Sequence, residues 1–278
     1  MDIYIFEQFI TQLDNRDGEN FFKYLVVNAQ EEIDIANRKY LIYNPEPNKD
    51  ISLIVEAEKG PKKNSKYNIT GFKFHHNSSQ MWDFKIVTPM KSFSNTYVVK
   101  RTNNTGSSCV RLVLEEVLEK ELKPGTKIRG QVCGIVMNAD IYESEEAYRN
   151  SVPVDKNGNK TIMNDGYIIP YNLITNNDAK LSEEERNKKD HRRDNLLTFK
   201  ATLQNVREQT VSMFNLTSPN YYIATIDTTY GKLDIVIPNS IASRYKDGIE
   251  DNFVIKGELL LSCDVCVNKY KKKRKKEK

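Results

Sequence analysis

Hydrophobic and polar residues alternate along residues 197–204, as they do in a β-strand with one buried face. Two further apolar runs meet across a short connection that contains Gly231, and a glycine supplies the positive φ that a tight hairpin needs. After Pro238 the apolar positions take helical spacing, which ends at Gly248. The pattern predicts three strands, a short helix and two strands, at residues 197–204, 221–228, 232–237, 239–247, 253–261 and 264–267.

This order of elements resembles that of the OB-fold, a small Greek-key barrel that commonly binds oligonucleotides. The resemblance covers residues 195–268 and lies in element order, without a signature peptide. It implies a closed five-stranded barrel and a nucleic-acid ligand.

Residues 66–148 show a second pattern of the same kind. Two alternating runs, 67–75 and 81–88, flank a polar link and predict a hairpin. A strand, a short helix, a break at Pro124-Gly125 and a long strand follow, at residues 109–114, 115–122 and 127–137. The sequence therefore predicts a second barrel.

A short match links the two predicted barrels. Residues 128–132 read Ile-Arg-Gly-Gln-Val and residues 255–259 read Ile-Lys-Gly-Glu-Leu, each after a predicted helix and a glycine break. The match indicates an internal repeat, although two such pentapeptides also arise by chance. We predict a mainly β fold with short helices: an N-terminal α+β extension or cap (1–65), a first OB-like barrel (66–148), an insertion and charged connector (149–194), a second OB-like barrel (195–268) and a basic tail (269–278).

The composition is that of a chain that buries cores. Of its 278 residues, 38% are hydrophobic and 10% aromatic. No apolar run approaches the roughly 18 to 20 residues of a membrane helix, so no membrane partner is expected. Four cysteines fit a reducing compartment, and we expect the cytoplasm. The abundance of Lys, Asn, Ile and Tyr is typical of an AT-rich genome, as in some bacteria, phages and mobile elements.

The net charge of +4 is unevenly distributed. Residues 269–278 contain eight Lys or Arg and one Glu, so this segment is strongly basic and the rest of the chain is slightly acidic. Contiguous cations bind polyanions by releasing condensed counterions, without sequence preference. A solubilising end, an acidic protein partner and an anionic lipid are the alternatives. The predicted contacts in the tail are Lys271, Lys272, Lys273, Arg274, Lys275 and Lys276.

The predicted hairpin of the first barrel carries four aromatic residues on one face, Phe72, Phe74, Trp82 and Phe84. Single-strand binders stack bases on such residues, but a stripe at this spacing is more often core. A ligand would then meet the opposite face. The predicted contacts are Tyr67, Lys73, His75, Lys85, Lys100 and Arg101 in the first barrel, and Lys200, Tyr222, Tyr230 and Lys232 in the second.

Catalytic and metal-binding patterns are sparse. Cys263 and Cys266 form one CxxC, yet no second pair or histidine with ligand spacing accompanies it, so we expect small buried thiols and no metal or cofactor. Asp227 and Asp234 flank a predicted hairpin and could serve a nuclease, but aspartates in such places are usually edge-strand charges. We expect no enzyme.

Taken together, these patterns predict a non-catalytic nucleic-acid-binding protein. Single-stranded DNA is the expected ligand, RNA is a second possibility, and a role in DNA processing of a bacterium, phage or mobile element would fit. The alternative is a protein-interaction module of a phage or mobile element, acting as a scaffold or an inhibitor, in which the barrels do not bind nucleic acid and a protein is the partner.

Overall fold

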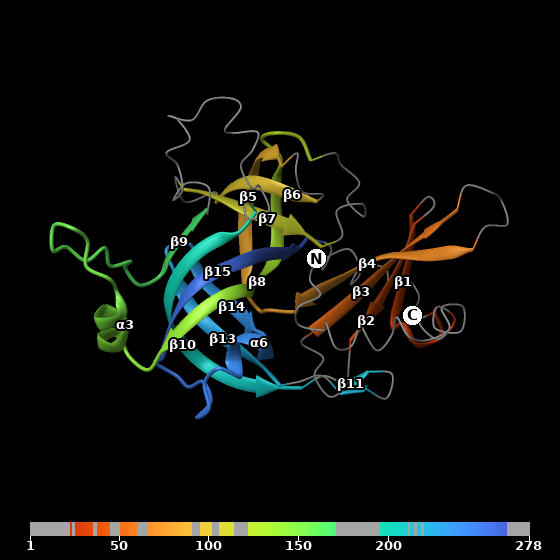
Figure 1. Ribbon diagram of the computed structural model, residues 1–278. Coiled ribbons are helices and arrows are strands. Elements are labelled where there is room, and N and C mark those ends of the chain that lie inside the picture. The colour runs from red at the N-terminus through yellow and green to blue at the C-terminus, as the bar shows by residue number, and fades with distance from the viewer. Residues whose placement is uncertain are drawn as a thin grey trace.

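The computed structural model describes residues 23, 26–35, 38–44, 51–60, 66–90, 95–101, 106–113, 122–170, 195–210, 212–213, 216–217 and 220–265. This part of the chain consists mainly of β-strands with few short helices, which confirms the predicted mainly β class. Two larger sheets account for most of it, and they lie next to each other in Figure 1. None of the described helices has the length and apolar character needed to cross a bilayer.

The first sheet is an antiparallel meander near the N-terminus. Its strands are β1 (Glu31–Ile35), β2 (Arg38–Tyr43), β3 (Ile51–Lys59) and β4 (Tyr67–His76), in that order. The first part of β3 is buried on both faces, and Ser52 is the one polar residue among its first five. We call this element the four-stranded sheet; it is coloured red to orange in Figure 1.

The predicted hairpin between residues 67–75 and 81–88 is wrong. β4 pairs with β3, with Phe72 opposite Val55, whereas β5 (Met81–Pro89) pairs with strands of the other sheet. The polar link between β4 and β5 is therefore a crossing from one sheet to the other. Alternation in a sequence indicates which face of a strand is apolar, but it does not identify the partner strand.

The larger sheet contains a first closed circuit of strands, which we call the first ring. β5, β6 (Thr96–Arg101) and β7 (Ser107–Leu112) form an antiparallel meander. β7 runs parallel to β15 (Val254–Asp264), β15 is antiparallel to β8 (Lys127–Tyr142), and β8 returns to β5. The circuit is closed by a strand from near the C-terminal end of the described chain.

A second closed circuit has the same connectivity, and we call it the second ring. β10 (Leu197–Gln209), β13 (Tyr221–Thr228) and β14 (Gly231–Ile237) form its meander. β14 runs parallel to β8, β8 is antiparallel to β15, and β15 returns to β10. Helix α6 (Asn239–Ala242) lies between β14 and β15 in the sequence.

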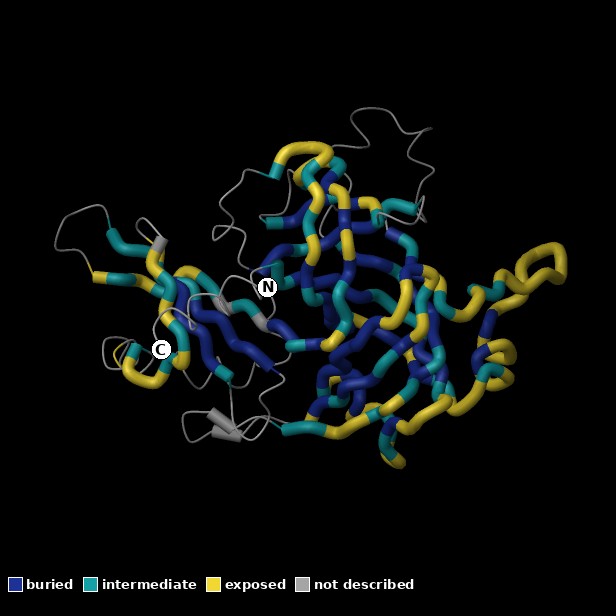
Figure 2. Tube along the Cα trace, turned by 180° about the vertical axis from the view of Figure 1, so that it is seen from behind, coloured by how far each residue is buried: buried dark blue, intermediate teal, exposed yellow. Residues whose placement is uncertain are grey.

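The long strands β8 and β15 thus belong to both rings. β8 follows the meander of the first ring along the chain and completes the second ring beside β14. β15 follows the meander of the second ring and completes the first ring beside β7. Residues 66–148 and 195–268, which the sequence divides into two barrels, each take one strand from the other segment. They share a hydrophobic core that runs through both rings. Figure 2 shows buried residues gathered in the interior of the larger sheet.

The matching pentapeptides occupy equivalent positions at the beginning of the shared strands. A Cβ added to Gly257 would lie 2.0 Å from the carbonyl oxygen of Asn138, and one added to Gly130 would lie 2.2 Å from Sγ of Cys263. Each glycine lets one shared strand approach the other closely where they cross. The short sequence repeat therefore marks the same structural step in both rings.

Replacing Gly257 by alanine is expected to lower the free energy of unfolding by about 3 kcal/mol, because the backbone of Asn138 cannot turn away from the new methyl group. Urea denaturation followed by circular dichroism measures this loss. Gly158→Ala is the control: its φ is +82° and no atom lies within 4 Å, so only backbone strain of about 1 kcal/mol is expected. Equal losses in the two variants would contradict a close crossing at Gly257.

The four-stranded sheet packs against the outside of the rings. Leu41, Leu53 and Val55 of this sheet form one hydrophobic cluster with Ile135 of β8 and Val236 of β14.

An insertion lies on the second ring. Its helix α3 (Glu145–Ser151) begins at the N-cap Ser144, and its strand β9 (Tyr167–Pro170) pairs with the edge of β10. A two-residue pair, β11 (Ser212–Met213) and β12 (Leu216–Thr217), completes the described strands.

Candidate nucleic-acid interface

Three lysines lie in register across neighbouring strands of the first ring. Lys85 of β5 stands opposite Lys127 of β8 on one side and opposite Lys100 of β6 on the other. All three are exposed, and no described carboxylate forms an ion pair with any of them. Adjacent strands are about 4.8 Å apart, and like charges directly opposite each other destabilise a sheet. This lysine row therefore concentrates positive charge at a cost to stability.

The alternation of β5 explains why the row faces outward. Trp82, Phe84 and Ile86 point into the core of the first ring, while Asp83 and Lys85 point out. The interpretation of Trp82 and Phe84 as core is confirmed, because both are buried. They do not form an exposed stacking platform.

Lys127 was not among the residues predicted from the sequence. It is the first residue of β8, directly after the turn that contains Gly125 with φ of +92°. Lys127 and Arg129 are two residues apart on β8, so alternation along the strand places them on the same face, and both are exposed. Its position beside Lys85 could not be found that way, because it depends on the pairing of β5 with β8.

A mixed pair of charges lies beside the row on the same face. Arg129 of β8 stands opposite Asp83 of β5, and their side chains form an ion pair of 3.9 Å. Both side chains are more than half exposed, so the pair contributes little to stability. It does, however, balance the charge of Arg129, and the unbalanced positive charge is concentrated at the row.

Next to Lys100, the end of the first ring meets the hairpin turn between β13 and β14. The guanidinium carbon of Arg101 lies 4.8 Å from the centre of the Trp82 ring. Trp82 Nε1 donates a hydrogen bond of 3.1 Å to the carbonyl oxygen of Lys232, and the Tyr230 ring lies 6.2 Å from the Trp82 ring. Tertiary structure thus brings four predicted contacts from both segments, Lys100, Arg101, Tyr230 and Lys232, to one end of the first ring.

These four residues differ in exposure. Lys100 and Lys232 are exposed and Arg101 is half-buried, whereas only 7% of Tyr230 is exposed. Lys232 stands opposite Asp227 in the hairpin, so its charge has a partner within reach. Tyr230 packs into the end of the first ring, where burial raises the pKa of its hydroxyl. The predicted exposure of Tyr230 is wrong because the turn docks against the other ring.

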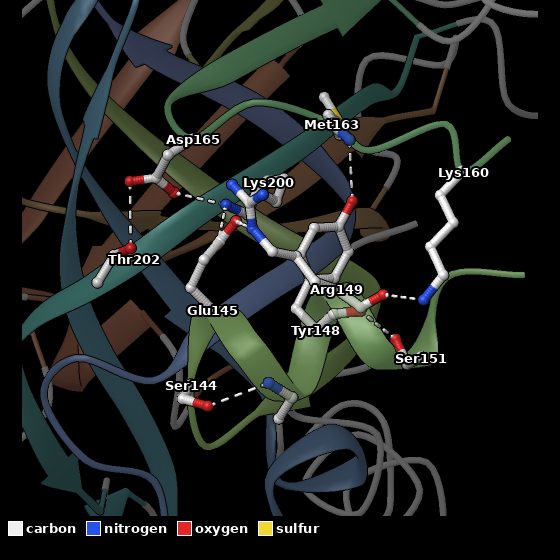
Figure 3. Close-up of polar contacts among 11 residues, drawn as sticks. Ser144, Glu145, Tyr148, Arg149, Ser151, Lys160, Met163, Asp165, Lys200 and Thr202 are labelled. Carbon is white, nitrogen blue, oxygen red and sulfur yellow. Dashed lines mark hydrogen bonds and ion pairs between the residues drawn. The ribbon is translucent and has the colours of Figure 1, made fainter.

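The predicted exposure of Lys200 is also wrong, because the residue is buried. Figure 3 shows the polar contacts that surround it. Its ammonium group is buried under the insertion, where it pairs with Glu145 and lies 3.4 Å from Asp165 Oδ1. The Tyr148 ring covers it at 5.1 Å. Partial burial acts to raise the pKa of Glu145, but hydrogen bonds and charges from Lys200 and Arg149 lower it below the usual value. Lys200 therefore holds α3 on the second ring and does not face a ligand.

His75 is a further correction, since it lies buried between the four-stranded sheet and the rings. Its Nδ1 is 3.4 Å from Oγ of Ser262 and 3.6 Å from Sγ of Cys133. Burial lowers the pKa of His75 to about 3, and the charges of His76 and Arg111 act in the same direction. The face of β4 that was predicted to meet a ligand instead packs against β8 and β15.

Lys73 and Tyr67, the other two predicted ligand contacts on β4, interact with other residues of the protein. Lys73 forms an ion pair of 2.5 Å with Glu56 and donates a hydrogen bond of 3.0 Å to the carbonyl oxygen of Val113. Tyr67 is half-buried, with the ammonium group of Lys39 5.4 Å from its ring centre. Lys73 thus ties the four-stranded sheet to the first ring, and neither residue adjoins the lysine row.

Tyr222 and the basic tail complete the predicted set. Tyr222 is half-buried on β13; burial raises the pKa of its hydroxyl, and the nearby charge and hydrogen bond of Glu208 add to the rise. The tail residues Lys271, Lys272, Lys273, Arg274, Lys275 and Lys276 lie outside the described residues, so their contribution remains a prediction.

The two aspartates considered for a nuclease do not form a joint site. Asp234 is buried and accepts hydrogen bonds of 2.7 Å from Ser78 and 2.8 Å from Thr225, whereas Asp227 is exposed and accepts one from Gln204. Cys263 is buried and forms no disulfide bond with a described residue, and Cys266 lies outside the described residues. Within the described ranges, no group of three His, Cys, Asp or Glu side chains is placed to hold a metal ion.

Comparisons with protein-family models, with curated proteins and with solved structures find no match. Functional inference therefore rests on the geometry of the chain itself. The lysine row lies on the outer face of the first ring, and Arg101, the residue after Lys100, leaves β6 on the opposite face and lies over Trp82.

Proposed function

We propose that the protein is a non-catalytic nucleic-acid-binding protein whose ligand is single-stranded DNA. The observation that carries the proposal is the register of Lys127, Lys85 and Lys100 across three adjacent strands. Natural sheets avoid like charges directly opposite each other, so a row of three has a use that offsets its cost. Phosphates on a nucleic-acid backbone neutralise such a row and release condensed counterions.

The connectivity of the rings supports the same proposal. Each ring has an antiparallel meander whose third strand runs parallel to the completing strand, as in an OB-like barrel. We propose that the two rings are OB-like barrels fused through β8 and β15. Barrels of this kind commonly bind oligonucleotides, but the fold alone does not assign a ligand, so the lysine row is the stronger support.

The biological setting belongs to the same proposal. The composition is typical of an AT-rich bacterium, phage or mobile element, and a role in DNA processing in the cytoplasm follows from binding single strands. RNA is a second ligand of the same chemistry, since both nucleic acids carry backbone phosphates and contacts to phosphates do not distinguish them. Competition between DNA and RNA strands of one sequence separates the two ligands.

Fluorescence anisotropy of a labelled single-stranded oligonucleotide tests the proposal. The full chain and a chain ending at Asn268 are both expected to bind at low salt, with the shorter chain weaker. Loss of the tail removes about seven net charges, so the slope of log affinity against log salt concentration should become shallower by up to about 5.

Three outcomes would count against it. No binding by either chain at low salt would reject nucleic-acid binding and favour a protein-interaction module. Binding by the full chain alone would assign affinity to the tail and leave the rings as scaffolds. Magnesium-dependent loss of the oligonucleotide would reveal an enzyme.

A further inference from the structure

Trp82 is the only tryptophan in the sequence, and the guanidinium group of Arg101 covers one face of its ring. Trp82 packs at the end of the first ring against Phe84 and Tyr230, with ring centres 6.0 and 6.2 Å away. Its Nε1 is held by the carbonyl oxygen of Lys232. The guanidinium of Arg101, 4.8 Å from the ring centre, stacks over it.

This cover differs from the packing of the other large core residues. Core rings are normally covered by aliphatic side chains, whose removal leaves a cavity. Arg101 is half-buried at the last residue of β6, so its guanidinium can leave without any core side chain moving. Its position is also costly for the charge, since burial lowers the pKa of Arg101, while the charge of Asp83 acts to raise it.

A phosphate at the lysine row offers Arg101 a better partner. Arg101 directly follows Lys100, the last lysine of the row, and leaves β6 on the opposite face; because it is the last residue of the strand, its long side chain can swing round the strand end toward a phosphate held by Lys100. A guanidinium forms two parallel hydrogen bonds to a phosphate, and such charge-assisted pairs are stronger than contact with a ring. A backbone phosphate beside Lys100 would therefore draw Arg101 away from the ring.

We infer that the Trp82 face under Arg101 is a stacking site for one unpaired nucleobase, which enters as Arg101 moves to a backbone phosphate. This inference rests on the proposed function and specifies its ligand as a strand with free bases. A base and a guanidinium are both planar, so a base can take the same place over the indole. The paired bases of a duplex are stacked on each other and cannot enter without being flipped.

The fluorescence of Trp82 tests the inference directly, because no other tryptophan contributes to the signal. Three ligands of equal length are compared: a single-stranded oligonucleotide, an abasic strand that keeps the phosphates, and a duplex. A terminal label on each reports binding by anisotropy. All three are expected to bind through the lysine row, with the base-bearing strand about tenfold tighter than the abasic strand.

The Arg101→Ala variant separates stacking from the movement of arginine. With no guanidinium to move, the base-bearing strand is expected to quench Trp82 still, while the abasic strand and the duplex leave its emission unchanged. Arg207→Ala, which removes an exposed arginine of β10, should behave as the native chain. Urea midpoints of both variants check that they are folded.

Two results would overturn the inference. One is equal quenching by base-bearing and abasic strands in Arg101→Ala; the other is unchanged emission although anisotropy shows that the base-bearing strand is bound. In both cases the proposed binding function stands. If no labelled strand binds the native chain at low salt, the proposed function and the stacking site fall together.

Discussion

Single-stranded DNA is expected to bind about 10²-fold more weakly at about 50 mM salt when Lys85, Lys100 and Lys127 are all replaced by alanine. Each lysine that neutralises a phosphate on a single strand contributes about 0.7 to the slope of log affinity against log salt concentration. Removing the row should therefore make that slope shallower by about 2. Anisotropy titrations at four or five salt concentrations give both values.

The control removes the same charge from elsewhere. Lys156, Lys246 and Arg207 are exposed and lie outside the first ring, and their joint replacement by alanine should change affinity much less. Equal losses in the two triple variants would show that only net charge matters and that the row has no special role. Because like charges no longer face each other, the row variant should be at least as stable as the native chain.

Replacement of His75 by leucine is expected to remove a large part of the pH dependence of folding. In the folded protein the pKa of His75 is about 3, against 6.5 for an ordinary histidine, so the folded state keeps it neutral and the unfolded state takes up a proton below about pH 6.5. The free energy of unfolding is then highest above pH 6.5. It falls as the pH decreases, by at most about 1.4 kcal/mol per pH unit and by about 5 kcal/mol in total near pH 3.

Urea denaturation between pH 7.5 and about pH 5 isolates this effect from most carboxylates. The native chain should lose stability across this window, and His75→Leu should lose much less. Ser262→Ala is the matched control, because it removes the contact of 3.4 Å with Nδ1 without removing the titrating group. If His75→Leu lost stability with falling pH as steeply as the native chain, His75 would not be the source of the pH dependence. Its side chain would then take up a proton in the folded state as readily as in the unfolded state.

The local features of the sequence predicted many of the described strands, although the two strands expected at 253–261 and 264–267 form one strand, β15. Alternation along β5 placed Trp82 and Phe84 in the core and Lys85 on the surface, because side chains of a strand point to opposite faces in turn. The paired glycine steps at Gly130 and Gly257 marked equivalent places in the fold. These properties depend on neighbouring residues alone, so they can be read without knowing the rest of the structure.

Exposure was predicted poorly wherever a distant segment covers a strand. Lys200 alternates as an outward residue, yet α3 and Asp165 bury it. His75 lies on a face that the packing of the four-stranded sheet against β8 and β15 removes from solvent. A polar residue on the outer face of a strand carries no local signal of what will pack on it.

The sequence by itself determined the mainly β class, the apolar faces of β5 and β10, and the outward direction of Lys85. Only the tertiary structure decided that β8 and β15 serve both rings, that Lys127 completes the lysine row, and that Arg101 and Tyr230 meet at Trp82. The physical reason is the range of the forces involved. Alternation follows from the pleat of one strand, whereas strand partners are selected by contacts between residues that are distant in the sequence, as for β5 with β8 and β8 with β15.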